Sequence, residues 1–110
     1  MADRATELRY APVNTVGAGP TTVVSAEAGM RVCVVGFVLS ASAVVLVTWQ
    51  DNTSSLCDCH LGQNVPFPVP CASGGWFMTE ADEPLVLSQI GAGNVGGAVV
   101  YRMVPEHQRY

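Results

Sequence analysis

Lysine is absent from this sequence, and charged residues of either sign are few. All five basic residues are arginines, set against nine acidic residues, so charged residues make up only 13% of the 110-residue chain. Recognition of nucleic acid depends on clustered positive charge, so a net charge of −4 without a basic stripe argues against nucleic acid as a partner. A surface with so few charges favours partial coverage by another protein.

The sequence also lacks a secretory leader and a helical pattern, and these two absences bear on the cellular compartment and on the fold class. The first seven residues lack the apolar core of a secretory leader, so we expect no export and reduced cysteines during synthesis. No segment combines a 3.6-residue apolar period with helix-capping residues, which argues against a helical fold. With 49% hydrophobic residues the chain is too apolar for disorder, and its length predicts a single domain.

The longest uncharged stretch, residues 32–50, decides the fold class. Its nineteen residues match the length of a membrane-spanning helix. Seven of them are valine, which favours strands, and small residues at 40–43 interrupt the stretch. We therefore predict two buried strands over residues 31–39 and 44–50, joined by a tight turn, and no membrane partner.

Turn residues divide the rest of the chain at nearly regular intervals. Further strands are predicted over residues 21–26, 54–61, 76–79, 85–90 and 95–104. Such spacing is typical of a sandwich or barrel, so we expect an all-β, jelly-roll-like antiparallel β-sandwich of about eight strands. The expected organisation is an extended N-terminal arm (residues 1–19), the β-sandwich domain (20–105) and a polar C-terminal tail (106–110).

Two features of these strands bear on assembly. Residues 65–71 carry Pro66, Pro68 and Pro70 around Phe67, and proline cannot donate to a sheet ladder, so this extended piece is predicted at a sheet edge. The two valine-rich strands are apolar on both faces, whereas a sandwich strand normally exposes one face to water. Coverage by a second subunit is the simplest explanation, and coverage by a loop or the arm is the alternative.

The four cysteines leave three alternatives open. Cys57, Cys59, His60 and Cys71 could supply the ligands of a tetrahedral zinc ion. However, a single residue separates Cys57 from Cys59, whereas paired zinc ligands are usually separated by about two to four residues. In a strand, His60 would also point to the opposite face from these cysteines. A disulfide that includes Cys71 is the second alternative. We expect free buried thiols, and therefore no metal and no cofactor.

No arrangement of residues predicts catalysis. Adjacent residues of a strand point to opposite faces, so Cys59 and His60 do not form a nucleophile–base pair, and nothing orients His107 as a base. Residues 91–96 match the dinucleotide-binding pattern G-x-G-x-x-G, but a strand-like segment follows instead of the required helix. We interpret these glycines as a hairpin turn and a closely packed strand start.

Trp49, Trp76 and Phe77 are the aromatic candidates for a binding surface. Together they could form a platform for a sugar, but such residues serve more often as core anchors or interface hot spots. We expect Trp76 and Phe77 at a subunit interface.

A series of valine, glycine and aromatic motifs extends over residues 21–104. The motifs are Thr21-Thr22-Val23-Val24 with Gly29 and Arg31, Gly36-Phe37-Val38-Leu39-Ser40-Ala41-Ser42, Val45, Val47 and Trp49, Gly75-Trp76-Phe77, Leu85-Val86-Leu87 and Gly97-Ala98-Val99-Val100-Tyr101. This series resembles the small jelly-roll decoration (cement) proteins of tailed-phage capsids.

The resemblance implies a non-enzymatic virion protein that is assembled in the host cytoplasm. It would bind the major capsid protein on the capsid exterior as a homodimer or homotrimer. We expect capsid contacts from the arm, through Arg4, Arg9 and Tyr10, and contacts with capsid protein or a sister copy from the edge strand near Pro66, Phe67 and Pro68. The alternative is a carbohydrate- or receptor-binding module of a phage tail fibre.

Overall fold

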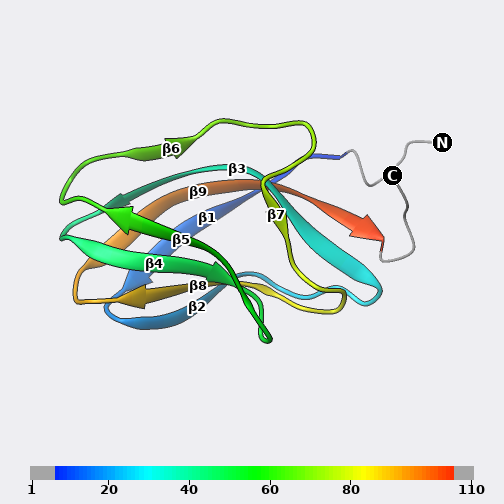
Figure 1. Cartoon of the computed structure of the whole chain (residues 1–110), viewed down its shortest axis with the longest axis horizontal. Helices are drawn as coiled ribbons and strands as arrows, with labels where there is room; N and C mark the ends of the chain where they lie inside the picture. Colours follow the sequence, from blue (N-terminus) through cyan, green and yellow to red (C-terminus); the bar gives the residue numbers. More distant parts are fainter. Residues whose placement is uncertain (1–6, 106–110) are drawn as a thin grey trace.

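A computed structural model describes residues 7–105, and these residues form nine strands (Figure 1). The strands are β1 (Arg9–Val16), β2 (Gly19–Val24), β3 (Met30–Ala41), β4 (Val45–Gln50), β5 (Ser55–Leu61), β6 (Phe67–Val69), β7 (Phe77–Met78), β8 (Leu85–Ile90) and β9 (Asn94–Pro105). Across this part of the chain, no helix has the length and apolar character that a membrane crossing requires. Arg4 and the predicted C-terminal tail lie outside the described residues.

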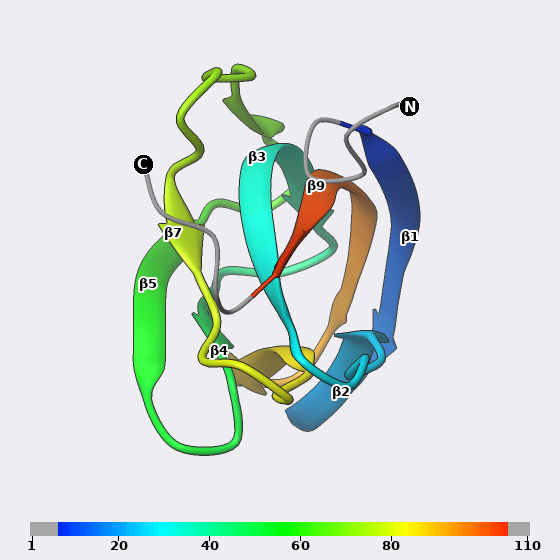
Figure 2. The same ribbon diagram turned by 90° about the vertical axis from the view of Figure 1, so that its right-hand side faces the viewer.

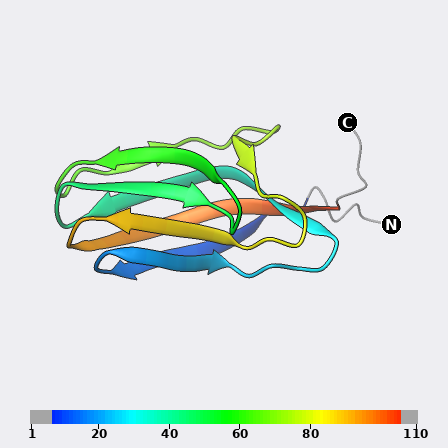
Figure 3. The same cartoon turned by 60° about the horizontal axis from the view of Figure 1, so that its bottom comes forward.

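The strands form two antiparallel sheets that pack face to face (Figure 3). Sheet A has the order β1-β9-β3-β6, with the short β7 also paired to β3, and sheet B has the order β2-β8-β4-β5. Four pairs nest along the chain: β1 with β9, β2 with β8, β3 with β6, and β4 with β5. A long hairpin rolled into two sheets in this way is a jelly roll, which confirms the predicted fold class.

The core lies between the sheets and consists mainly of valine, leucine and aromatic side chains. In β4, Val45, Val47 and Trp49 are buried, whereas the residues between them are partly exposed. This period of two is expected of a strand with one face against a core. Trp49 meets Phe37 of sheet A edge-on, with ring centroids 5.4 Å apart, so an aromatic pair joins the two sheets.

The N-terminal segment belongs to the sandwich, and the prediction of an extended arm is wrong for its central part. Residues Arg9–Val16 form β1, an edge strand of sheet A, in antiparallel register with β9. Ala11, Val13 and Thr15, which alternate along β1, are buried. Their side chains are small or partly polar, so the alternation in hydrophobicity is too weak to indicate a strand from the sequence.

Two pairs of consecutive strands do not form the expected hairpins. β3 and β4 belong to different sheets, and so do β8 and β9. The turn predicted between the valine-rich strands and the glycine turn at residues 91–94 are therefore connections that cross from one sheet to the other. Each strand buries one face in the shared core, so its apolar pattern is the same whether the next strand pairs with it or faces it across the core.

Part of the outer face of β3 is covered by a loop of the same chain. Cys33 and Val35 are each only 3% exposed, although neither belongs to the core cluster between the sheets. Gly75, in the loop before β7, lies so close to Cys33 that a Cβ there would collide with the thiol sulfur. Arg102 Nη1 donates to the carbonyl of Ser73 at 2.9 Å and so holds this loop. A loop of the same chain therefore covers this part of β3, and burying these two residues does not require a second subunit.

The proline-rich segment lies at a sheet edge, as predicted. β6 pairs with β3 alone, at the end of sheet A, and contains Pro68. Phe67 stacks on Phe37 with ring centroids 6.3 Å apart, which anchors the edge strand to the core.

Candidate functional site

Four loops meet at one end of the sandwich, on the left in Figure 1. They connect β1 to β2, β3 to β4, β5 to β6, and β8 to β9. Gly17 donates a backbone hydrogen bond to Gly93 (3.0 Å) and Ser42 donates one to Asn94 (2.9 Å), while a third, of 2.8 Å, joins the β5–β6 loop to the end of β3. The four loops therefore form one continuous surface, which we call the loop end.

The loop end is uncharged and exposes four large aliphatic side chains. Its large exposed side chains are Val16 (84% exposed), Val44 (78%), Ile90 (64%) and Val65 (56%). The sequence has no Asp, Glu, Lys, Arg or His at residues 16–19, 41–45, 61–65 or 90–94. Exposed apolar patches are typical of interaction surfaces, so the loop end is a candidate for one.

The opposite end of the sandwich, which faces the viewer in Figure 2, carries acidic residues. Asp51 follows β4 there, and its buried carboxylate accepts backbone hydrogen bonds from Thr53, Ser54 and Glu80. Burial alone would raise the pKa of Asp51, but these hydrogen bonds outweigh it and lower the pKa to about 2. The carboxylate therefore anchors the β4–β5 turn to the chain that follows β7.

Two residues expected to contact a capsid, Arg9 and Tyr10, lie at the start of β1. The Arg9 guanidinium donates to Glu27 Oε2 at 2.8 Å and lies 3.6 Å from Glu7, so it is already paired within the chain. Tyr10 is 71% exposed. Tyr10 is therefore free of the rest of the chain over most of its surface, whereas Arg9 could contact another protein only by giving up its ion pair.

A second candidate site, the aromatic cleft, opens between β5 of sheet B and β6–β7 of sheet A. It holds about 380 Å³, with residues 56–59 of β5 on one side and Phe67, Trp76 and Phe77 on the other. Trp76 is 52% exposed, and its indole Nε1 donates to the carbonyl of Pro70 at 2.8 Å, which fixes the ring at the cleft.

The aromatic cleft brings together residues that the sequence indicated separately, namely Cys57, Cys59, Phe67, Pro68, Trp76 and Phe77. Cys71 instead lines a groove on the outer face of sheet A, and His60 is exposed opposite Leu46. Within residues 7–105, no three His, Cys, Asp or Glu side chains are placed to hold a metal ion. The proposed zinc ligands are therefore not assembled.

All four cysteines are free thiols, but they differ in exposure. Cys33 and Cys59 are buried as expected, whereas Cys71 is exposed. Burial, together with the neighbouring Cys57, raises the pKa of Cys59 to about 12. Since the thiolate is the nucleophile, the Cys59 thiol is poorly suited to covalent catalysis.

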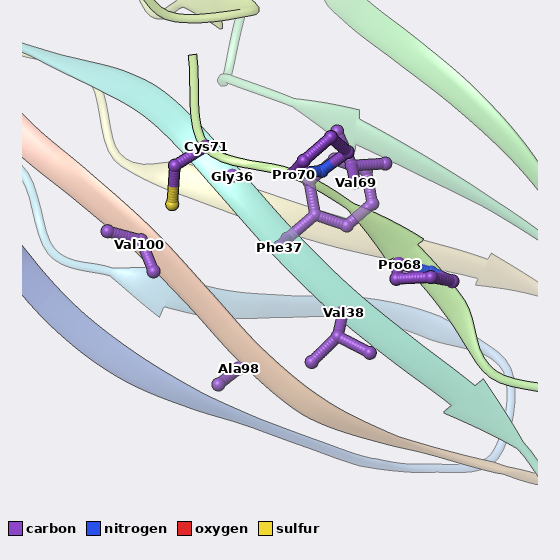
Figure 4. A pocket seen from close by; sticks show the side chains of 9 residues that line it. All are labelled: Gly36, Phe37, Val38, Pro68, Val69, Pro70, Cys71, Ala98 and Val100. Carbon is purple, nitrogen blue, oxygen red and sulfur yellow. The ribbon is translucent and has the colours of Figure 1, made fainter. Parts of the chain in front are cut away.

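The groove on the outer face of sheet A lies over β3, between β6 and β9 (Figure 4). It holds about 420 Å³, and apolar side chains line it, including Val38, Ala98 and Val100. Pro68 and Pro70 border both the groove and the aromatic cleft, so β6 separates the two hollows.

The glycine motif at residues 91–96 lacks the structural context of a nucleotide site. It covers the β8–β9 loop and the start of β9, and a strand follows it. The predicted close packing occurs at the next residue: Gly97 has φ +148°, and a Cβ there would overlap the carbonyl oxygen of Val38. This glycine allows β9 to approach β3 closely.

The loop end is the candidate surface that the sequence did not indicate. Val16, Val44, Val65 and Ile90 are far apart in the chain, and each adjoins a small residue or a proline that marks a turn. Only the strand order shows that their loops meet. Known protein families and curated proteins offer no match to this chain, so its function is inferred from these surfaces.

Proposed function

We propose that this protein is a non-enzymatic virion protein that binds the outside of a phage capsid shell and stabilises it. The observation that carries the proposal is the loop end, where four aliphatic side chains are exposed on an uncharged surface held by backbone hydrogen bonds. Each of these side chains that becomes fully buried against capsid protein would contribute roughly 1.5–3 kcal/mol, before the costs of association.

The difference between the two ends of the sandwich supports attachment in one orientation. If the loop end contacts the capsid, the acidic residues of the opposite end remain in water, and no charge has to be desolvated. Among these, Glu80 and Asp82 are exposed. Association of several copies on the shell, as homodimers or homotrimers, would add avidity to each contact.

Co-sedimentation with empty heads of the phage that encodes this chain tests the proposal. We expect the protein to sediment with the heads and to raise the temperature at which they open. The double variant Val44→Ser/Ile90→Ser should lose this binding, because hydroxyl groups replace the aliphatic contacts. The control is Glu80→Gln, which alters an exposed residue at the opposite end of the sandwich and should leave binding unchanged. If the unsubstituted protein does not bind, or if both variants lose binding equally, the proposal is refuted.

The second candidate function is a carbohydrate- or receptor-binding module of a phage tail fibre. It is favoured by Trp76, whose half-exposed ring is held at the aromatic cleft by its bond to Pro70. This function predicts that the isolated protein binds a glycan on an array, and that Trp76→Ala abolishes binding without changing the circular dichroism spectrum. Glycan binding together with a failure to bind heads would reverse the order of the two candidates.

A further inference from the structure

The four sheet edges differ in whether a proline protects them. β1, β2 and β6 each contain a proline, at Pro12, Pro20 and Pro68. Proline lacks the N–H that a docking strand would pair with, so these three edges are poor templates for strand addition. The fourth edge is β5, and its seven residues include no proline. β7 also lacks proline, but it shares the β6 edge of sheet A and spans only two residues.

The aromatic cleft lies beside this unprotected edge. Residues 56–59 of β5 form one of its walls, and the other wall belongs to β6 and β7, which pair with β3 and not with β5. The gap between the sheets therefore combines a strand edge with an apolar hollow. The volume of this hollow, about 380 Å³, lies within the range of roughly 300–1,000 Å³ for ligand pockets.

We propose that β5 docks an extended peptide segment of a partner protein, which adds to sheet B as a fifth strand and places an apolar side chain in the aromatic cleft. In this mode of recognition, main-chain hydrogen bonds provide affinity and the pocket selects the side chain. The rings of Phe67 and Trp76 contact the inserted side chain. Trp76 is the half-exposed ring of the cleft, and docking buries it.

The charge on β5 indicates which peptide fits. Asp58 is the one acidic residue of β5, which has no arginine or lysine, and Asp58 is exposed. Within residues 7–105, its carboxylate accepts a hydrogen bond of 2.9 Å from Thr48 and has no arginine partner. An arginine or lysine opposite Asp58 would form a favourable cross-strand pair. Because side chains alternate along a strand, that basic residue lies next to the apolar residue that enters the cleft.

A second copy of this chain fits the same edge less well. Two β5 strands that pair antiparallel along their whole length would centre on Asp58, which is the fourth of seven residues. Two carboxylates would then lie opposite each other, and like charges in that position are destabilising. We therefore assign the edge to a peptide of a different sequence.

Fluorescence anisotropy with a labelled heptapeptide tests this assignment on the full chain. The peptide alternates valine and threonine around a central leucine and carries an arginine next to that leucine. We expect saturable binding, with protection of the β5 amides from hydrogen exchange at saturation. The same peptide with alternate backbone amides N-methylated cannot pair with an edge strand, and it should bind about tenfold more weakly or worse.

Two variants separate the contribution of the cleft from that of the charge. Trp76→Ala should weaken binding about tenfold by removing a wall of the cleft. Asp58→Asn keeps an oxygen for Thr48 but should remove the preference for the arginine peptide over its glutamate analogue. The controls are Tyr10→Ala, an exposed aromatic residue outside the cleft, and Glu80→Gln, an exposed acid at the opposite end. Both controls should bind as the unsubstituted chain does.

Several outcomes would overturn the assignment. These are an absence of binding, equal binding of the methylated and unmethylated peptides, protection of a strand other than β5, and dimerisation of the peptide-free chain through β5. The double variant Val44→Ser/Ile90→Ser should still bind the peptide, because the loop end is a different surface. A failure of the capsid proposal is therefore distinguishable from a failure of this one.

Discussion

Thr15 of β1 and Gln89 of β8 form a buried hydrogen bond of 2.6 Å that connects the two sheets. The Gln89 side-chain amide also donates to the carbonyls of Gly91 (3.0 Å) and Gly93 (2.7 Å). Thr15 Oγ1 in turn accepts from the backbone N–H of Val95 at 3.2 Å. Buried polar groups that are fully paired hold a unique arrangement. This network lies directly behind the loop end and fixes the β8–β9 loop in place.

Thr15→Val should therefore destabilise the fold despite its nearly equal volume. The substitution leaves Gln89 Oε1 without its donor in a buried site, which should lower the free energy of unfolding by about 1–3 kcal/mol. Urea denaturation followed by circular dichroism measures this change. The control Thr22→Val, at an exposed position of β2, should change stability by less than about 0.5 kcal/mol. Equal effects of the two substitutions would contradict the role of the network.

The stability of the protein should fall in acid because of Asp51. Its pKa is about 2 in the folded state against a reference value of 3.8, so the carboxylate form stabilises the fold above pH 4. This contribution, about 2 kcal/mol at 1.36 kcal/mol per pKa unit, is lost as the pH falls from about 4 towards 2. We expect the difference in unfolding free energy between the unsubstituted protein and Asp51→Asn to shrink over that interval. A constant difference from pH 6 to pH 2 would contradict the assignment.

Gly97→Ala should be among the most damaging single substitutions in the chain. The added methyl group would overlap the carbonyl oxygen of Val38, and φ of +148° is unfavourable for any residue with a Cβ. Strain and overpacking together should cost about 3 kcal/mol or more. The neighbouring Gly96→Ala is the matched control, since its Cβ would make only an ordinary contact at 3.8 Å. Thermal denaturation of both variants should show a large loss of stability for the first alone.

The thiols should react in the order of their exposure. Cys71 is exposed and should be alkylated by iodoacetamide in the native protein, whereas Cys33 and Cys59 are buried and should react only after unfolding. Burial also raises the pKa of Cys33, which reduces its thiolate fraction further. Mass spectrometry of partly labelled protein measures the order. Equal labelling of Cys33 and Cys71 under native conditions would show that the loop before β7 does not cover β3.

The predicted strands agree best with the structure where a run of residues ends at clear turn residues on both sides. The strand predicted at residues 44–50 corresponds to β4, and the one predicted at 85–90 coincides with β8. Long apolar runs between turn residues have no other favourable structure in a domain without helical periodicity. β1 was missed because its inward residues, such as Ala11 and Thr15, differ little in hydrophobicity from those that face water.

The sequence indicated single residues of the candidate sites but not which of these residues lie together. Trp76, Phe77 and Cys59 could each be singled out as chemically notable, but nothing local predicts that β5 lies across from β6 and β7. The zinc alternative was already disfavoured locally, by the short Cys57–Cys59 spacing and the opposite face of His60, whereas the separation of Cys71 from β5 depends on which strands are neighbours.

From its sequence alone, the chain is an all-β sandwich with proline at one edge, because valine content, period-two burial and turn residues are local properties. The tertiary structure decided that β3 pairs with β9 rather than with β4, that a loop covers Cys33, and that the loops beside Val16, Val44, Val65 and Ile90 meet at one end. Strand pairing is chosen by contacts between residues far apart in the chain, and many pairings satisfy the same alternation of apolar and polar residues. The surfaces available to partners follow from that choice.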